Sequence, residues 1–179
     1  INTQGANKVL LNGNPLSKTR DILGLVTTVI FSPEDLELVK GEPSSRRRFI
    51  DELGTLISPK LSTTRSDFER TLKQRNTLLK SLGRRAPSTQ ARATLDAWDE
   101  QLIQTGAELI ATRLENIKRI EPHLTEFGTV ISGDTEPLFL SYSNSWLPIE
   151  VSDKAEIANL FNIELANRSK DEVDRGATL

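Results

Sequence analysis

Three consecutive arginines, Arg46–Arg48, are the most distinctive charged feature of the sequence. Arg47 lies four residues before Asp51, and Arg48 lies four residues before Glu52. That spacing places each arginine beside its acid on one face of a helix, where an exposed pair contributes only about 0.3–0.5 kcal/mol. Ion pairing on a solvated surface is therefore a sufficient explanation for these two arginines.

Arg46 has a different setting, because the apolar residues Phe49 and Ile50 follow it at three and four positions. Those spacings place its guanidinium beside the apolar stripe of the same helix. A guanidinium in that place extends to water, finds an acceptor, or faces a partner. Arg46 is accordingly a candidate contact for a phosphate group or for another protein surface.

A second set of cations falls on one side of the helix that we predict between Ser58 and Gly83, at about 100° per residue. This stripe contains no acid, although Glu69 is close. Non-specific duplex binding requires only lysines and arginines placed along the phosphates, whereas base stacking requires aromatic residues, which the stripe lacks. Two interpretations stay open, contact with DNA and an ordinary solvated face. The candidate DNA-binding residues are Arg70, Lys73, Lys80 and Arg84.

Arg75 and Asn76 lie at or beside the apolar seam of the same helix, within the run LKQRN. Buried polar groups need hydrogen-bond partners. We therefore predict that both residues are structural and fix how two helices, or two lobes, dock. The apolar residues of the seam are Leu61, Phe68, Leu72, Leu79 and Leu82.

Other chemistries find no support in the sequence. A phosphate-cradling loop needs the pattern G-x-x-x-x-G-K-[ST], and no such run occurs. The single histidine, His123, has no evident triad or metal partner and is expected at the surface. The absence of cysteine excludes disulfides and thiolate metal sites. We predict no catalytic residue, no metal site and no bound cofactor in this chain.

Charge is distributed unevenly along the 179 residues, although the formal net charge is only −2. Residues 40–85 hold 12 Lys and Arg against 5 Asp and Glu, a net charge of +7. Residues 86–179 hold 8 against 16, a net charge of −8. The basic part is therefore able to attract polyanions. No apolar run is long enough to span a membrane, and no signal peptide is visible. The lack of cysteine fits a cytoplasmic protein, which is the location we expect.

Helix signals dominate the chain. Ser32–Asp35 has the form of a capping box, and Lys40–Gly41 predicts a stop with a left-handed glycine. Pro43 opens the helix that carries the three arginines. A long helix is predicted from Thr94 to about Ile120, or to Phe127, with a kink or restart at Pro122. A last helix should begin at Ser152 or Asp153 and run to about Asp171.

Strand signals are few. Lys8–Leu11 followed by Asn12–Gly13 predicts a strand and a turn with positive φ. Leu25–Phe31 predicts a buried strand, and Leu138–Tyr142 a strand returning from the helices. Gly176–Leu179 is expected to begin another strand. Because so few strands do not make a stable sheet, we expect the others, and hence a longer protein, outside this chain.

Three runs in this order resemble the RecF family of bacterial recombinational-repair ATPases. They are FSPEDLELVKGEPSSRRRFIDEL over residues 31–53, LKQRNTLLK over residues 72–80 and LDAWDEQL over residues 95–102. The resemblance covers about Asn7 to Leu179, but only the middle of that family's proteins. The chain also contains no methionine, so we expect it to be a segment.

The resemblance implies an α/β fold that is predominantly α in this fragment. An antiparallel helical lobe would be attached to an incomplete sheet portion of an ABC-type ATPase head. It implies head residues 1–35, a helical lobe at residues 36–135 and a return to the head over residues 136–179.

For the full-length protein, the resemblance implies binding of ATP and Mg²⁺ and weak DNA-dependent ATPase activity. It further implies nucleotide-dependent homodimerisation and binding of gapped or duplex DNA. RecA would be loaded at single-strand gaps together with RecO and RecR. The chain itself would form one wall of a DNA groove. Alternatively, it is a helical protein-interaction module, docking RecR or another lobe, without direct DNA contact.

Overall fold

The computed structural model describes residues 8–22, 25, 28, 30, 32–83, 85–133, 138–148 and 151–178. The chain forms two compact units, residues 1–62 and residues 63–179. The expected three-part division at residues 35 and 135 remains a prediction. None of the helices in these ranges is long and apolar enough to cross a membrane.

The first unit begins with a minimal hairpin. Strand β1 (Leu10–Leu11) pairs antiparallel with β2 (Asn14–Pro15), with Leu10 opposite Pro15. The two turn residues, Asn12 and Gly13, have φ values of 51° and 85°. Both residues of a tight hairpin turn need positive φ, which asparagine and glycine tolerate. The predicted strand and turn are therefore confirmed.

Short helices follow the hairpin in the first unit. They are the 3₁₀ helices η1 (Thr19–Ile22) and η2 (Pro33–Leu36) and the α-helices α1 (Glu37–Lys40) and α2 (Pro43–Ile57). At the start of η2 the Ser32 backbone N–H donates to the Asp35 carboxylate at 2.6 Å, as a capping box requires. The predicted strand at Leu25–Phe31 falls mostly outside the described residues.

The predicted left-handed stop at Gly41 is wrong. Gly41 ends α1 in an extended conformation, with φ −86° and ψ −172°. Close packing accounts for the glycine, because an added Cβ would lie 2.4 Å from Glu37 Oε2 and 2.5 Å from the Glu37 carbonyl oxygen. Glycine is needed here for space and not for positive φ.

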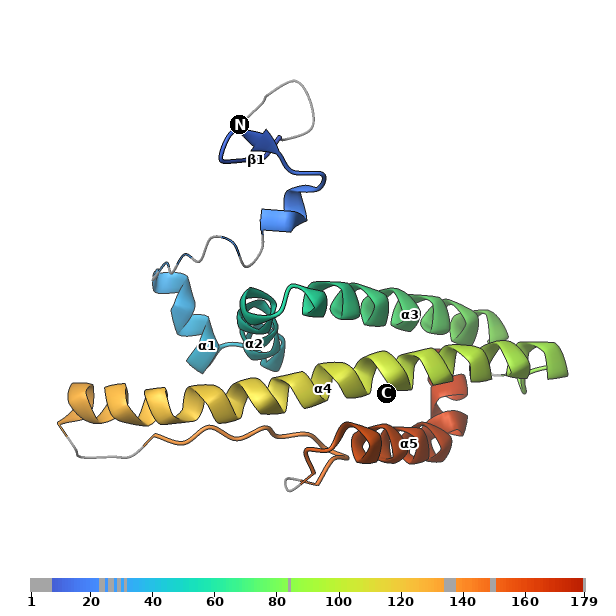
Figure 1. The fold of residues 1–179 in the computed structure, drawn as a ribbon. Helices are drawn as coiled ribbons and strands as arrows, with labels where there is room; N and C mark the ends of the chain where they lie inside the picture. The colour runs from blue at the N-terminus through green and yellow to red at the C-terminus, as the bar shows by residue number, and fades with distance from the viewer. Residues whose placement is uncertain are drawn as a thin grey trace. The chain divides into compact units, whose positions relative to one another are not determined.

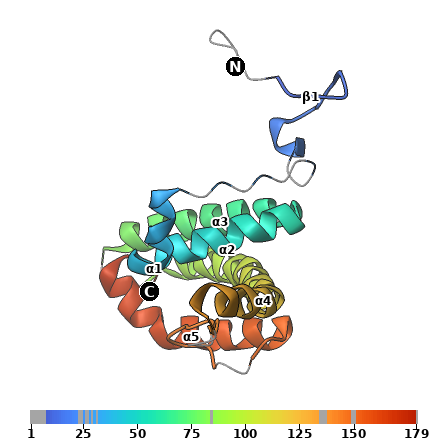
Figure 2. The same ribbon diagram turned by 90° about the vertical axis from the view of Figure 1, so that its left-hand side faces the viewer.

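Three long helices make up the second unit and can be followed in Figures 1 and 2. They are α3 (Lys60–Leu82, whose first residues belong to the first unit), α4 (Thr89–Ser132) and α5 (Lys154–Arg175). In both views α4 lies between α3 and most of α5. The helices α3 and α4 run antiparallel, as expected, and the small-sheet, mostly helical fold class is confirmed.

Helix α4 is longer than predicted and is not interrupted at Pro122. It begins after Ser88, whose hydroxyl accepts from the Ala91 backbone N–H at 3.2 Å, and ends at Gly133, whose φ is 68°. The expected restart at Pro122 is therefore wrong, since the helix continues through it. A proline removes one main-chain hydrogen bond of a helix. In a helix of 44 residues this loss is a small part of the total.

The predicted strand at Leu138–Tyr142 is also wrong. Residues 138–148 contain no assigned strand, and no strand pairs with them in the described part of the chain. An extended segment becomes a strand only when a partner satisfies its backbone. Here it packs along α4 instead, with Leu138 against Gly128 and the Thr125 hydroxyl donating to the Leu138 carbonyl at 3.2 Å.

Apolar residues from α4, α5 and the segment between them form a shared core. Within it, Trp146 stacks on Phe161 with ring centroids 5.1 Å apart. Gly106 is the close-approach point, because an added Cβ would lie 2.5 Å from Phe161 Cε1 and 3.2 Å from Phe68 Cε2. The most buried members are Ala107, Ile110, Leu147, Val151 and Ile157.

Helix α5 has clear signals at both ends. The Asp153 carboxylate accepts from the backbone N–H groups of Ala155 and Glu156 at 2.9 and 3.0 Å, so the predicted N-cap is confirmed. Gly176 ends the helix in the left-handed conformation with φ 68°. The expectation of a strand beginning at Gly176 is therefore wrong at that residue, and Leu179 lies outside the described residues.

Candidate nucleic-acid interface

Arg75 lies at the centre of a buried polar cluster that joins all three long helices. Its Nε donates to Asp99 Oδ1 of α4 at 2.5 Å, and its Nη2 donates to Glu172 Oε2 of α5 at 2.7 Å. Its Nη1 donates to Thr178 Oγ1 at 2.8 Å. Each guanidinium nitrogen thus has a different acceptor, and the arginine holds three segments together.

The ion pair between Arg75 and Glu172 is buried, so each charge needs the other for compensation. The side chains of Arg75 and Glu172 are 3% and 0% exposed. Burial acts to lower the pKa of Arg75, but hydrogen bonds to Glu172 and Asp99 outweigh it and hold that pKa above its usual value. The guanidinium therefore stays charged throughout the accessible pH range.

Asn76 fixes the chain that leaves α5. Its Oδ1 accepts from both the backbone N–H and the hydroxyl of Thr178, each at 2.7 Å. Consecutive residues of α3 therefore bind the same residue beyond the end of α5. We predicted that Arg75 and Asn76 lie at or beside the apolar seam of α3. In the structure their hydrogen bonds place them at the junction of α3, α4 and α5.

The predicted basic stripe lies about 140–160° around the axis of α3 from Arg75. Lys73 and Lys80 are exposed, and neither has an ion-pair partner within the ranges that the structure describes. Arg70 is exposed but pairs with Asp67 at 2.8 Å, which offsets its charge. Arg84 lies outside the described residues. The charges that remain free on α3 are therefore those of the two lysines.

Arg46 belongs to the first unit and lies in α2. Its Nη1 donates to the Gly41 carbonyl oxygen at 2.9 Å, so it binds the end of α1 while its side chain remains exposed. Arg47 and Arg48 are exposed as well. Asp51 is only 3% exposed, so it does not lie on the solvated face that the arginine pairing assumed.

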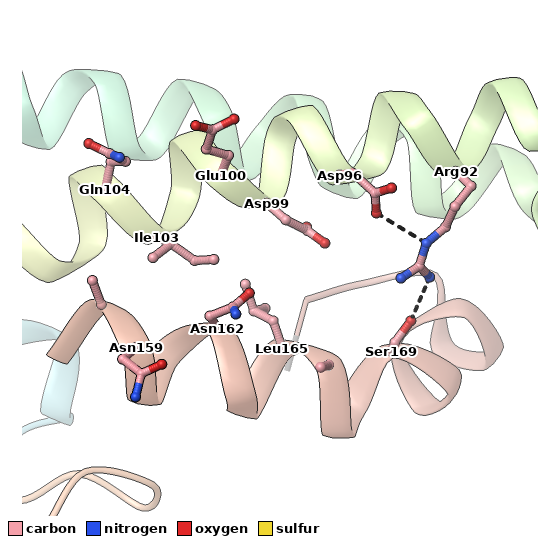
Figure 3. Close-up of a pocket in the computed structure, with 12 residues that line it drawn as sticks. Arg92, Asp96, Asp99, Glu100, Ile103, Gln104, Asn159, Asn162, Leu165 and Ser169 are labelled. Carbon is pink, nitrogen blue, oxygen red and sulfur yellow. Dashed lines mark hydrogen bonds and ion pairs between the residues drawn. The ribbon is translucent and has the colours of Figure 1, made fainter. Parts of the chain in front are cut away.

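A groove of about 520 Å³ runs between α4 and α5 (Figure 3). Arg92 crosses one end of it, with Nε 3.1 Å from Asp96 Oδ1 and Nη1 3.2 Å from the Ser169 hydroxyl. Asp99 and Glu100 also line it, so carboxylates outnumber the single arginine. Asp96 is paired with Arg92 and Asp99 with Arg75, so the groove offers no cluster of free cations, and we assign no DNA contact to it.

We assign no residue of this chain to a nucleotide or to a magnesium ion. The sequence lacks the phosphate-binding run. In the described ranges no cluster of three or more His, Cys, Asp or Glu side chains is arranged to hold a metal. Phosphate and Mg²⁺ binding need backbone N–H groups around a glycine-rich loop with carboxylate ligands. No step of ATP chemistry follows from these residues.

Sequence reasoning missed the partners of the basic and polar residues. Asp67 lies three residues before Arg70, a helical spacing that was visible in the sequence. Glu172 and Thr178 lie 97 and 103 residues from Arg75, and no local pattern connects residues so far apart. Only the packed fold reveals that they share a cluster.

No family model matches the chain. Similar proteins are nevertheless found among curated sequences. The DNA replication and repair protein RecF of Streptomyces avermitilis is 41% identical over 182 residues, covering all of this chain and 48% of the relative. RecF of Cutibacterium acnes is 40% identical over 193 residues, with 100% and 49% covered. The chain thus spans about half the length of the relatives it matches.

Solved structures agree with these relatives. Two structures of the recombination mediator protein RecF of the RecFOR pathway, with ATPrS and with ATP, superpose with TM-scores of 0.86 and 0.85. Both are 30% identical to this chain, and the match covers 99–100% of it and 47% of the solved chain. Sequence similarity and shared fold extend over the same residues, and the chain therefore belongs to the RecF family, of which it represents a fragment.

Proposed function

We propose that this chain is the helical part of a DNA replication and repair protein and that the exposed side of α3 contacts DNA phosphates. The observation that carries the proposal is the pair Lys73 and Lys80, both exposed on a helix that the hydrogen bonds of Arg75 hold to α4 and α5. Family membership supports the choice of DNA as the polyanion.

Helix geometry supports a duplex as the ligand. Lys73 and Lys80 are seven residues apart, which is about two turns or roughly 10 Å along the axis. Duplex DNA carries a charge about every 3.4 Å along each strand, so two such lysines can reach phosphates of the same strand. Because no base-specific contact is implied, binding should depend on salt more than on sequence.

Charge reversal in the intact protein tests the proposal. Lys73→Glu with Lys80→Glu should lower duplex affinity at least about tenfold at low salt, because two attractions become repulsions. Fluorescence anisotropy with a labelled gapped duplex measures the affinity, and circular dichroism checks that the fold is kept. An unchanged affinity would exclude a DNA contact on this face.

A second candidate is that this part of the protein docks other proteins, RecR among them. The observation favouring it is a group of exposed apolar side chains near the C-terminal end of α4. Contiguous exposed apolar surface often marks an interaction site. The exposed fractions are 62% for Phe127, 78% for Val130, 87% for Ile131 and 76% for Phe139. Loss of RecR binding without loss of DNA binding in Phe127→Ser, Ile131→Ser would support this candidate.

For the whole protein we extend the proposal to the properties that the family implies. These are ATP and Mg²⁺ binding, nucleotide-dependent homodimerisation, and action with RecO and RecR in loading RecA at gaps in the cytoplasm. The solved relatives that contain ATP or ATPrS support the nucleotide part. Hydrolysis by the intact protein, measured with and without gapped DNA, tests it.

A further inference from the structure

We propose that the DNA-contacting surface is built from two helices and that Arg175, in the last turn of α5, is part of it. This inference rests on the proposed function of α3. Arg175 lies 95 positions after Lys80 in the sequence, so a stripe defined along α3 alone does not include it. The end of α5 at Gly176 brings Arg175 close to α3.

Gly176 brings the end of α5 onto Lys80. A Cβ added at Gly176 would lie 3.4 Å from Lys80 Cα and 3.6 Å from Lys80 Cγ. The stem of Lys80 therefore lies over this glycine, while the residue as a whole remains exposed. Because Arg175 directly precedes Gly176, its guanidinium is within side-chain reach of the space in front of Lys80.

The polar cluster described above keeps the two helix ends together. Thr178, two residues after Gly176, is held by Asn76 and by Arg75. Glu172, one turn before Gly176, is held by Arg75. The α3–α5 contact is thus fixed on both sides of Gly176, and Arg175 keeps a constant position relative to Lys80.

The proposal depends on the exposed charges at the ends of α3 and α5. Arg175 is exposed, and no ion pair of Arg175 is found among the described residues. Arg85, which follows the end of α3, is exposed as well. Two exposed acids flank Arg175: Asp171 lies one turn before it and Asp174 directly before it, and both limit the basic surface on that side. The surface therefore runs from Lys73 over Lys80 to Arg175.

A matched set of charge reversals tests this inference. In the intact protein, Arg175→Glu should weaken duplex binding at least about threefold, as removal of one phosphate contact would. Lys170→Glu is the control, because it changes the charge equally on the same helix but about 140° away around its axis. We expect Lys170→Glu to leave the affinity within twofold. Arg175→Gln, with unchanged melting temperature, separates charge from fold.

The outcomes distinguish this inference from the proposed function. If Lys80→Glu weakens binding while Arg175→Glu has no more effect than Lys170→Glu, the two-helix surface is refuted and the α3 contact stands. If neither Lys73→Glu nor Lys80→Glu weakens binding, the α3 contact fails and the inference fails with it. Support requires that both Lys80→Glu and Arg175→Glu weaken binding and that Lys170→Glu does not.

Discussion

At the scale of single residues, the arginines of this chain differ in what they contact and not in their chemistry. Arg75 is buried with Asp99 and Glu172, whereas Arg70 shares an exposed pair with Asp67. Exposed pairs contribute little because water and salt screen them, but removal of a buried partner leaves a charge without compensation. Burial therefore separates the structural arginine from the surface ones.

Arg75→Ala should destabilise the protein by about 3–5 kcal/mol, since it leaves the Glu172 carboxylate buried without its guanidinium. Arg75→Lys should recover only part of this loss, because a lysine does not reach three acceptors at once. Arg92→Ala, which breaks the exposed pair with Asp96, should cost less than about 1 kcal/mol. Urea unfolding measures all three, and equal costs for Arg75→Ala and Arg92→Ala would refute the structural role.

Glu34 offers a pH-dependent test of the capping region. Hydrogen bonds from its own backbone and from the Ser32 hydroxyl hold the pKa of Glu34 below its usual value, although the side chain is fully exposed. A lowered pKa means that the stabilisation is present above the usual carboxyl pKa and is lost as pH falls through the lowered one. Its titration followed by NMR should have a low midpoint that Ser32→Ala raises, and an unshifted midpoint would contradict the geometry.

At the scale of helices, local signals predicted more than non-local ones. The start of α5 at Asp153 and the end of α3 at Gly83, whose φ is 54°, follow from capping residues that act within one turn. The strand at Leu138–Tyr142 could not be settled locally, because a strand requires a partner. The partners of Arg75 depend on how α3, α4 and α5 pack, which no spacing within one helix reveals.

Gly106 tests the packing of those helices. Gly106→Ala should destabilise the protein by about 1–3 kcal/mol, because the new methyl group meets Phe161, whose ring is already stacked on Trp146. The gain of about 1 kcal/mol in helix propensity reduces this cost but does not reverse it. Gln101→Ala, at an exposed position of α4, serves as the control. A Gly106→Ala protein that melts at or above the parent temperature would contradict the close approach.

At the scale of the whole molecule, charge is distributed unevenly over the helical unit. The charged residues that line the groove between α4 and α5 are Arg92, Asp96, Asp99 and Glu100. The outer side of α3 carries Lys73 and Lys80. The formal net charge of −2 does not reflect this uneven distribution, on which the proposed DNA contact of α3 depends.

The salt dependence of duplex binding tests the central claim most directly. Each phosphate contact contributes about 0.9 to the slope of log K against log salt concentration. Lys73→Gln with Lys80→Gln should therefore reduce that slope by about 1.8 in the intact protein. The control, Lys118→Gln with Lys170→Gln, removes the same charge from exposed positions of α4 and α5 and should leave the slope unchanged. Equal slopes for the parent protein and the Lys73, Lys80 variant would contradict a DNA contact on α3.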